Sequence, residues 1–251
     1  MARQKGIIKL EGRIGDLSFY KNGGEYMARS KSGVDGDRIK KDPAFIRTRE
    51  NGAEFGSAGK AGKVLRNALK VPISKSADKQ VAGRLGAELL KVIQADTTNL
   101  RGERTVTAGD LNLLKGFEFN KAVGLESVVT LPYTLVFTRS SGDAVVNIPA
   151  FVPKSEIAQV EGATHFRLVA GVAAVDFANQ SYEVDVAESA DLVYDANTQP
   201  SAPILLNISA DSPHPVFMVF GVEYYQSVNG QMYPLNNKAS NPLALVLVDV
   251  V

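Results

Sequence analysis

The pattern of apolar and polar positions changes near the middle of the chain, from helical spacing to strand spacing. Before the helices, residues 5–30 carry apolar residues at short intervals with glycines between them, and residues 21–25 (KNGGE) are a turn signal. This pattern predicts a β-hairpin arm, and the polar residues 31–41 predict a loop after it. Because two or three strands are not stable alone, we expect the arm to pack on the rest of the chain or on a neighbouring subunit.

Two helices are predicted in the next part of the chain. Asp42 is a favoured N-cap and is followed by proline, which is preferred at the first helical position, so a helix is expected from there to about Lys70. A second helix is expected from Ser76, as its N-cap, to about Asp96. Its apolar residues recur every three or four positions and define one buried face.

From about Ser127 onward, short apolar runs are separated by turn signals every 8–15 residues or so, a spacing typical of all-β domains. Asn229-Gly230 is the strongest hairpin signal among them. The last strand, residues 243–251, is apolar on both faces, so we expect both to be covered. The fold class predicted is α+β. It comprises a β-hairpin arm and loop (1–41), a two-helix region (42–116) and an antiparallel β-sandwich, jelly-roll or immunoglobulin-like (117–251).

The composition excludes several kinds of site and shows an uneven distribution of charge. The chain of 251 residues has no cysteine, which excludes disulfides, thiolate metal sites and cysteine nucleophiles. Residues 1–116 contain 23 Lys/Arg and 13 Asp/Glu, whereas residues 117–251 contain 5 Lys/Arg and 14 Asp/Glu. The basic half of one copy is therefore expected to attract the acidic half of another, unless the two halves neutralise each other within one molecule.

No motif for catalysis, a cofactor or a metal survives inspection, so we expect a protein that is not an enzyme. Lys60 and Lys63 follow glycines as in a phosphate-binding loop, but each precedes an apolar residue instead of Ser or Thr. His165 and His214 lack the spacing of metal ligands or of a catalytic triad. The acidic run in residues 185–195 lacks EF-hand spacing, which leaves loose Ca²⁺ binding as a minor alternative.

Three sets of residues are candidates for contact surfaces. A stripe without side chains on the first helix indicates close approach by another segment, a subunit or a phosphate backbone, or else a break in the helix. The stripe is Gly56, Gly59 and Gly62. Basic residues surround it, and the set taken as a contact surface is Arg47, Arg49, Lys60, Lys63 and Arg66. The acidic surface expected to meet a neighbour's basic half is Asp185, Glu188, Asp191 and Asp195.

The segments RQKGIIKLEGRIGDLSFYKNGGEYMAR and DPAFIRTRENGAEFGSAGKAGKVLRNAL resemble a group of bacterial proteins. In these proteins a glycine-rich β-segment is followed by an Arg-rich helix and a β-domain, and they carry no assigned activity. The overall plan is similar to phage-type virion and tail-tube subunits. That resemblance implies an extended arm and a β-domain that build repeating contacts.

The function expected from these observations is a non-enzymatic structural subunit that assembles head-to-tail into a filament, tube or shell. The alternatives are a nucleic-acid-associated protein that uses the basic helical region, which is not favoured, and a ligand-binding β-sandwich. After its first charged residues the chain has only Gly6-Ile7-Ile8 before Lys9, too short for a secretory signal. No run approaches the ~20 apolar residues of a membrane span, so cytoplasmic synthesis without a membrane partner is expected, with the subunit in an assembled particle or filament.

Overall fold

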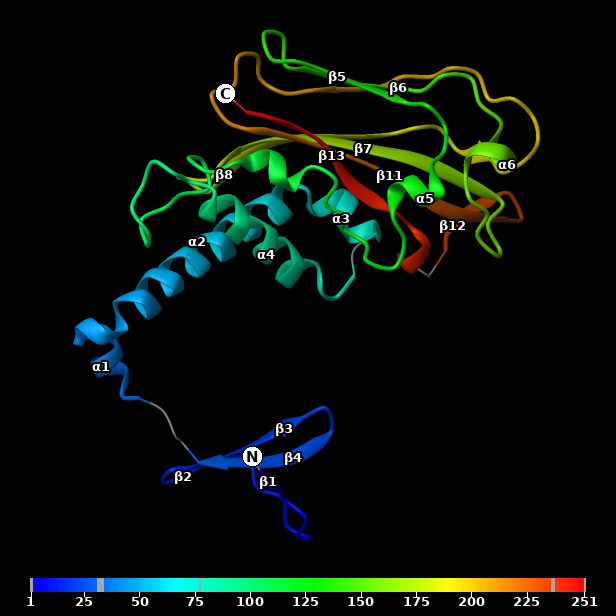
Figure 1. Ribbon diagram of the computed structural model, residues 1–251. Helices are drawn as coiled ribbons and strands as arrows, with labels where there is room; N and C mark the ends of the chain where they lie inside the picture. Colours follow the sequence, from blue (N-terminus) through cyan, green and yellow to red (C-terminus); the bar gives the residue numbers. More distant parts are fainter. Residues whose placement is uncertain (1, 31–33, 77, 236–237, 251) are drawn as a thin grey trace. The chain divides into compact units, whose positions relative to one another are not determined.

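The chain forms two compact units, Met1–Arg49 and Glu50–Val251, in a computed structural model. The structure describes residues 2–30, 34–76, 78–235 and 238–250. It confirms the predicted α+β class, with N-terminal strands, helices and a β-sandwich-like domain (Figure 1). The predicted helical region (42–116) falls mainly in the second unit, together with the predicted β-domain (117–251).

The first unit is a small antiparallel sheet with the strand order β1-β4-β3-β2. Its strands are β1 (Ala2–Arg3), β2 (Gly12–Ile14), β3 (Leu17–Asn22) and β4 (Glu25–Ser30). Gly23 and Gly24 join β3 to β4 with φ values of 58° and 90°, which only glycine adopts readily. None of the unit's described residues is buried.

The predicted loop 31–41 is only partly irregular in the structure. Residues 31–33 lie outside the described residues, and Gly36–Lys41 forms helix α1. The loop prediction was wrong for this part, because Asp35 caps the helix by accepting from the backbone N–H of Asp37 and basic residues occupy its last turn. The predicted cap at Asp42 is confirmed, since its carboxylate accepts from the N–H of Ala44 at 2.9 Å. It opens the 3₁₀ turn η1 (Pro43–Phe45).

The helical layer of the second unit is made by α2, α3 and α4 with a 3₁₀ turn. These elements are α2 (Ile46–Ala68), α3 (Lys70–Ser76), α4 (Val81–Gln94) and η2 (Leu111–Leu114). The predicted N-cap at Ser76 was wrong, because Ser76 is the buried last residue of α3. The turn before α4 is held instead by Asp78, whose carboxylate accepts from the N–H of Gln80 at 2.7 Å.

The central sheet has the strand order β12-β11-β7-β8, with β13 on the same side of β11 as β12 and β9 on the same side of β7 as β8. Its strands are β7 (His165–Asp176), β8 (Ser181–Glu188), β9 (Leu192–Val193), β11 (Val216–Val228), β12 (Gln231–Pro234) and β13 (Leu243–Asp249). The predicted Asn229-Gly230 turn joins β11 to β12, and both residues have positive φ.

A second sheet of three strands lies over the face of the central sheet opposite the helices (Figure 1). Its order is β10-β6-β5, with β5 (Thr134–Thr138), β6 (Asp143–Asn147) and β10 (Ile204–Asn207). Short helical turns complete the unit: α5 (Leu125–Val128), α6 (Pro153–Glu156) and η3 (Lys238–Ser240). The apolar run that begins at about Ser127 becomes a strand only from Thr134, because Val128 ends α5 and Pro132 lacks the N–H that a strand ladder needs.

Two hydrophobic cores flank the central sheet. Alternate residues of β7 and β11 pack in one direction against Leu65, Leu85 and Leu89 of the helices, and in the other against the three-stranded sheet. The two-sided burial predicted for the last strand holds at its start, where Leu243 faces the helices and Ala244 faces the sandwich interior. The helices and both sheets of the second unit therefore form three layers.

We predict that alanine substitutions at two glycines of α2 change the free energy of unfolding by different amounts. An added Cβ at Gly59 meets nothing within 4 Å, so Gly59→Ala is expected to raise the free energy of unfolding by about 0.5–1 kcal/mol through helix propensity. At Gly62 the Cβ lies 3.2 Å from Cδ1 of the fully buried Leu89, so Gly62→Ala is expected to be less stable than Gly59→Ala. Urea denaturation measures both, and equal gains would contradict the close packing at Gly62.

Candidate functional site

A groove of about 500 Å³ opens between β5, at the edge of the three-stranded sheet, and β13 of the central sheet. We call it the edge groove. Apolar and aromatic residues form its walls: Leu125, Tyr133, Leu135, Ala244, Leu245 and Val246. Three charged residues line it as well, Lys115, Glu118 and Glu126. A second hollow of about 430 Å³ shares Lys115, Gly116 and Glu118 with it and continues toward α4.

The groove exists because two strand edges face it without being fully paired. β5 pairs only with β6, so its other edge has no strand neighbour among the described residues. β13 pairs with β11 on one side, and on its other side the segment 116–119 covers only Leu243–Leu245. Beyond Leu245, this side of β13 has no strand neighbour in the described part of the chain. Open edges of this kind pair readily with an added segment.

Glu118 carries an unsatisfied charge at one end of the groove. Its Oε1 accepts from the N–H of Leu125 at 2.9 Å, but its Oε2 is buried and has no hydrogen-bond partner among the described residues. Burial raises the pKa of Glu118, and the nearby charge of Glu126 raises it further, against a lowering by Arg84. Burial also raises the pKa of Tyr133, with both carboxylates contributing. The groove is therefore an apolar site with an excess of negative charge.

Arg84 of α4 fixes the position of Glu118. Its Nη1 donates to the carbonyl of Glu118 at 2.7 Å and its Nη2 donates to the carboxylate of Asp78 at 3.0 Å. The guanidinium also lies over the ring of Phe117, 5.1 Å from the centroid. Because Arg84 is engaged with these groups, it does not neutralise the Glu118 carboxylate by an ion pair.

A second charged cluster lies between α3 and the central sheet. Lys75 binds both Glu188 and the buried Glu223, the latter at 2.8 Å, and Arg167 binds Glu188 at 3.1 Å. The hydroxyl of Tyr225 donates to Glu223 at 2.7 Å, so every member has a partner. Partial burial opposes protonation of Lys75, but the two glutamates raise its pKa overall. These contacts hold α3 on the sheet, so the cluster is a structural clamp.

The structure divides the four acidic residues predicted as a contact surface. Glu188 belongs to the clamp, and Asp191 binds Arg167 at 2.5 Å. Asp185 lies on the opposite face of β8, where it accepts from the backbone N–H of Asn207 at 2.9 Å. Asp195 accepts from Asn197 in its own turn. Each of the four is therefore bound to groups of its own chain, and the structure brings only Glu188 and Asp191 together.

The predicted glycine stripe and basic surface are divided. Gly62 is buried against α4, whereas Gly56 and Gly59 face open space. Among the basic residues, Arg49 donates to two carbonyls of the first unit and Arg66 donates to the carbonyl of Gly62. The remaining three, Arg47, Lys60 and Lys63, are exposed and have no hydrogen bond or ion pair with the described residues.

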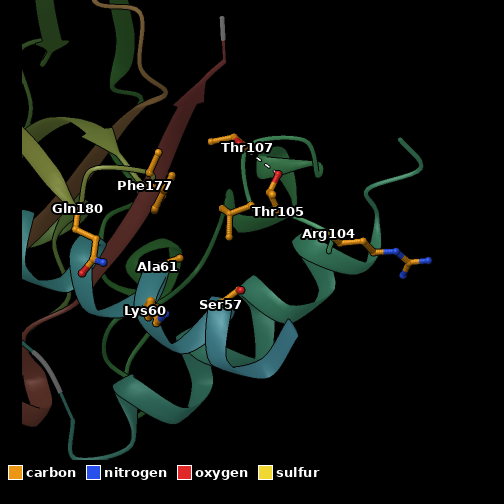
Figure 2. Close-up of a pocket in the computed structure, with 10 residues that line it drawn as sticks. Ser57, Lys60, Ala61, Arg104, Thr105, Thr107, Phe177 and Gln180 are labelled. Atoms are coloured by element: carbon orange, nitrogen blue, oxygen red, sulfur yellow. Dashed lines mark hydrogen bonds between the residues drawn. The ribbon is translucent and has the colours of Figure 1, made fainter. Parts of the chain in front are cut away.

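Lys60 also lines a smaller cavity of about 280 Å³ between α2, residues 104–107 and the turn after β7 (Figure 2). The hydroxyls of Thr105 and Thr107 lie 3.3 Å apart at one wall, and Gln180 lies at another. Figure 2 shows the Arg104 side chain pointing away from the other labelled residues. Lys60 and the two threonine hydroxyls offer fewer charged groups than the edge groove does.

Within the described residues, no cluster of three or more His, Asp and Glu is arranged to hold a metal ion. In that same part of the chain, no helix is both long and apolar enough to cross a bilayer.

No family model, curated protein or solved structure matches the chain.

Sequence reasoning missed the edge groove because four separate segments build it. Glu118, Glu126, Tyr133 and the start of β13 come together only in the folded sandwich. The one signal available was the β13 sequence itself, whose apolar residues on both faces indicate that more than one layer covers it.

We predict that Glu118 makes stability fall as pH rises. Because the folded-state pKa of Glu118 lies above its ordinary value, the folded protein holds this proton more tightly than the unfolded chain. The stabilisation is complete below the unfolded pKa and is lost as pH rises through the folded pKa. Glu118→Gln keeps an acceptor for Leu125, so it should match the wild type in acid and be more stable at neutral pH.

Thermal unfolding between acid and neutral pH measures this difference, with Glu161→Gln as the control for an exposed carboxylate outside the groove. A Glu118→Gln variant with no gain in thermal stability at neutral pH would contradict the unfavourable burial of the Glu118 carboxylate.

A second prediction concerns the clamp. Lys75→Met leaves Glu223, which is 6% exposed, without its cation, and should lower the free energy of unfolding by about 3–5 kcal/mol. The double variant Lys75→Met/Glu223→Gln removes the stranded charge and should recover a large part of that loss. Chemical denaturation tests both variants. A Lys75→Met variant as stable as the wild type would show that the Lys75–Glu223 ion pair does not stabilise the packing of α3 on the sheet.

Proposed function

We propose that the chain is a non-enzymatic structural subunit that assembles head-to-tail with copies of itself into a filament, tube or shell. One observation carries the proposal: the sheet of the first unit has a mainly apolar face on which none of the described residues is buried. The first unit is then the part of the subunit that binds a neighbour. The register of its strands shows which residues share this face.

Cross-strand partners share a face of a sheet, so the register assigns every side chain of the first unit to one side or the other. Ile14 pairs with Leu17, and Phe19 pairs with Ala28. The resulting face is mainly apolar: it consists of Ala2, Gly12, Ile14, Leu17, Phe19, Tyr26 and Ala28, and it also carries Lys21 and Ser30. The opposite face is mainly basic and polar, with Arg3, Arg13, Ser18, Tyr20, Asn22, Glu25 and Arg29, and it also carries Met27.

The apolar face needs a partner surface on energetic grounds. Ile14 is 60% exposed and Leu17 is 44% exposed, although such side chains gain about 1.5–3 kcal/mol each when fully buried. The unit's own ion pairs lie on the polar side, where Arg3 binds Glu25 at 2.9 Å in an exposed and therefore weak contact. A four-stranded sheet with no buried residue gains its stability by covering this face.

Net charge favours contact between the first unit of one copy and the second unit of another. Residues 1–49 contain 12 Lys/Arg and 6 Asp/Glu, whereas residues 50–251 contain 16 Lys/Arg and 21 Asp/Glu. Opposite net charges on donor and acceptor surfaces steer association and repel contacts between like surfaces. A contact between two different surfaces repeats along a chain of subunits instead of closing as a dimer.

The nucleic-acid alternative has less support. Of the five basic residues assigned to that surface, Arg49 and Arg66 donate to backbone carbonyls, and within the second unit only Lys60 and Lys63 remain without a described partner. A phosphate-binding surface depends on many cations that face one groove. Two lysines provide little of the positive charge that phosphate binding needs, so the apolar face of the first unit has more support as the contact surface.

We predict that substitution on the apolar face weakens self-association while the same substitution on the other face does not. Leu17→Lys places a charge in the buried contact and should lower the association constant about tenfold to a hundredfold, the equivalent of one buried leucine. Ser18→Lys adds the same charge at the neighbouring position, on the polar face, and serves as the matched control. Sedimentation velocity over a concentration series measures both constants, and equal effects of the two variants would rule out the apolar face as the contact.

A further inference from the structure

The loop between β1 and β2 presents two isoleucines at its tip. The side chain of Gln4 closes the loop at its base, since its Oε1 accepts from the N–H of Leu10 at 2.8 Å and its Nε2 donates to the carbonyl of Leu10 at 3.1 Å. Ile7 is 102% exposed and Ile8 is 80% exposed. Isoleucine is among the residues most often fully buried, so this pair, held out on a closed loop, indicates a surface that receives it.

The charges beside this tip are basic. Lys5 and Lys9 flank the isoleucines, and both are exposed. Lys9 also donates to the carbonyl of Gln4, which keeps its ammonium next to the base of the loop. A surface that accepts the loop therefore needs an apolar hollow with carboxylates at its rim.

The edge groove of the second unit has these properties. Its walls include Leu135 and Leu245, and its volume of about 500 Å³ lies in the range of binding pockets. Glu118 has a buried oxygen without a partner in the described residues, and Glu126 is exposed with no described ion pair. The free edges of β5 and β13 offer backbone groups to a segment lying between them.

We propose that the edge groove of one copy receives Ile7 and Ile8 of the next copy, with the loop lysines next to Glu118 and Glu126. This inference rests on the proposed function, because it names the acceptor surface for the same head-to-tail contact. Every copy carries one loop and one groove, so the contact repeats without using up either surface. Binding removes the isoleucines from water and adds positive charge to a groove whose two carboxylates outnumber its one lysine, Lys115.

The test uses the full-length protein in sedimentation velocity, with a donor variant and an acceptor variant. Ile7→Ser/Ile8→Ser should lower the association constant at least tenfold, and Glu126→Lys should lower it at least fivefold through repulsion of the loop lysines. Leu100→Ser, at a position 77% exposed in the second unit, is the control for loss of an exposed apolar side chain. Glu161→Lys, an exposed acid outside the groove, is the control for the charge reversal.

Mixing the two variants identifies the surfaces as partners. The donor variant keeps an intact groove and the acceptor variant keeps an intact loop, so an equimolar mixture should give one-to-one heterodimers and nothing larger. Absence of heterodimers overturns the inference, including the case in which each groove binds the loop of its own chain. Normal assembly of both variants also overturns the groove as acceptor while the proposed function stands. A wild-type protein that does not self-associate overturns both.

Discussion

Both faces of the central sheet are apolar, and the requirement to cover them organises the rest of the second unit. β7 and β11 carry alternate residues into two separate cores, one under α2 and α4 and one under the three-stranded sheet. The three-stranded sheet is narrower than the sheet it covers, so the side near β13 stays open and forms the edge groove. The candidate site is thus the place where the coverage of the sheet ends.

The same requirement is unmet in the first unit. Its strands place apolar residues such as Leu17 and Phe19 on one side and Arg13 and Arg29 on the other, but the described residues of the unit supply no second layer. The two units also differ in net charge, which is positive for the first and negative for the second. The acidic residues of β8 are largely bound within the chain, whereas Glu126 at the edge groove has no ion pair with the described residues.

Elements with a strong local signal could be predicted from the sequence. The Asp42 cap, the Asn229-Gly230 hairpin and the apolar last strand each depend on residues close together in the chain, and each is present. The start of the second helix was predicted at the wrong residue because Ser76 has the chemistry of an N-cap but is buried at the end of α3. Local propensity does not reveal which of two neighbouring turns the tertiary contacts select.

The sites required long-range pairing that no spacing rule contains. Glu188 was identified as part of an acidic run, but its partner Lys75 is 113 residues away. Similarly, the glycine stripe indicated close packing, and only Gly62 shows it, because α4 crosses α2 at that turn and not at Gly56 or Gly59. Residue type could be read from the sequence at these positions, whereas the identity of the neighbour came only from the fold.

The most direct measurement is the molar mass of the wild-type protein by multi-angle light scattering over a concentration series at low salt. Head-to-tail assembly predicts a mass that rises continuously with protein concentration and falls when salt screens the opposite net charges of the two units. A constant mass of 26.9 kDa, the mass of one chain, at every concentration and at every salt level would contradict it.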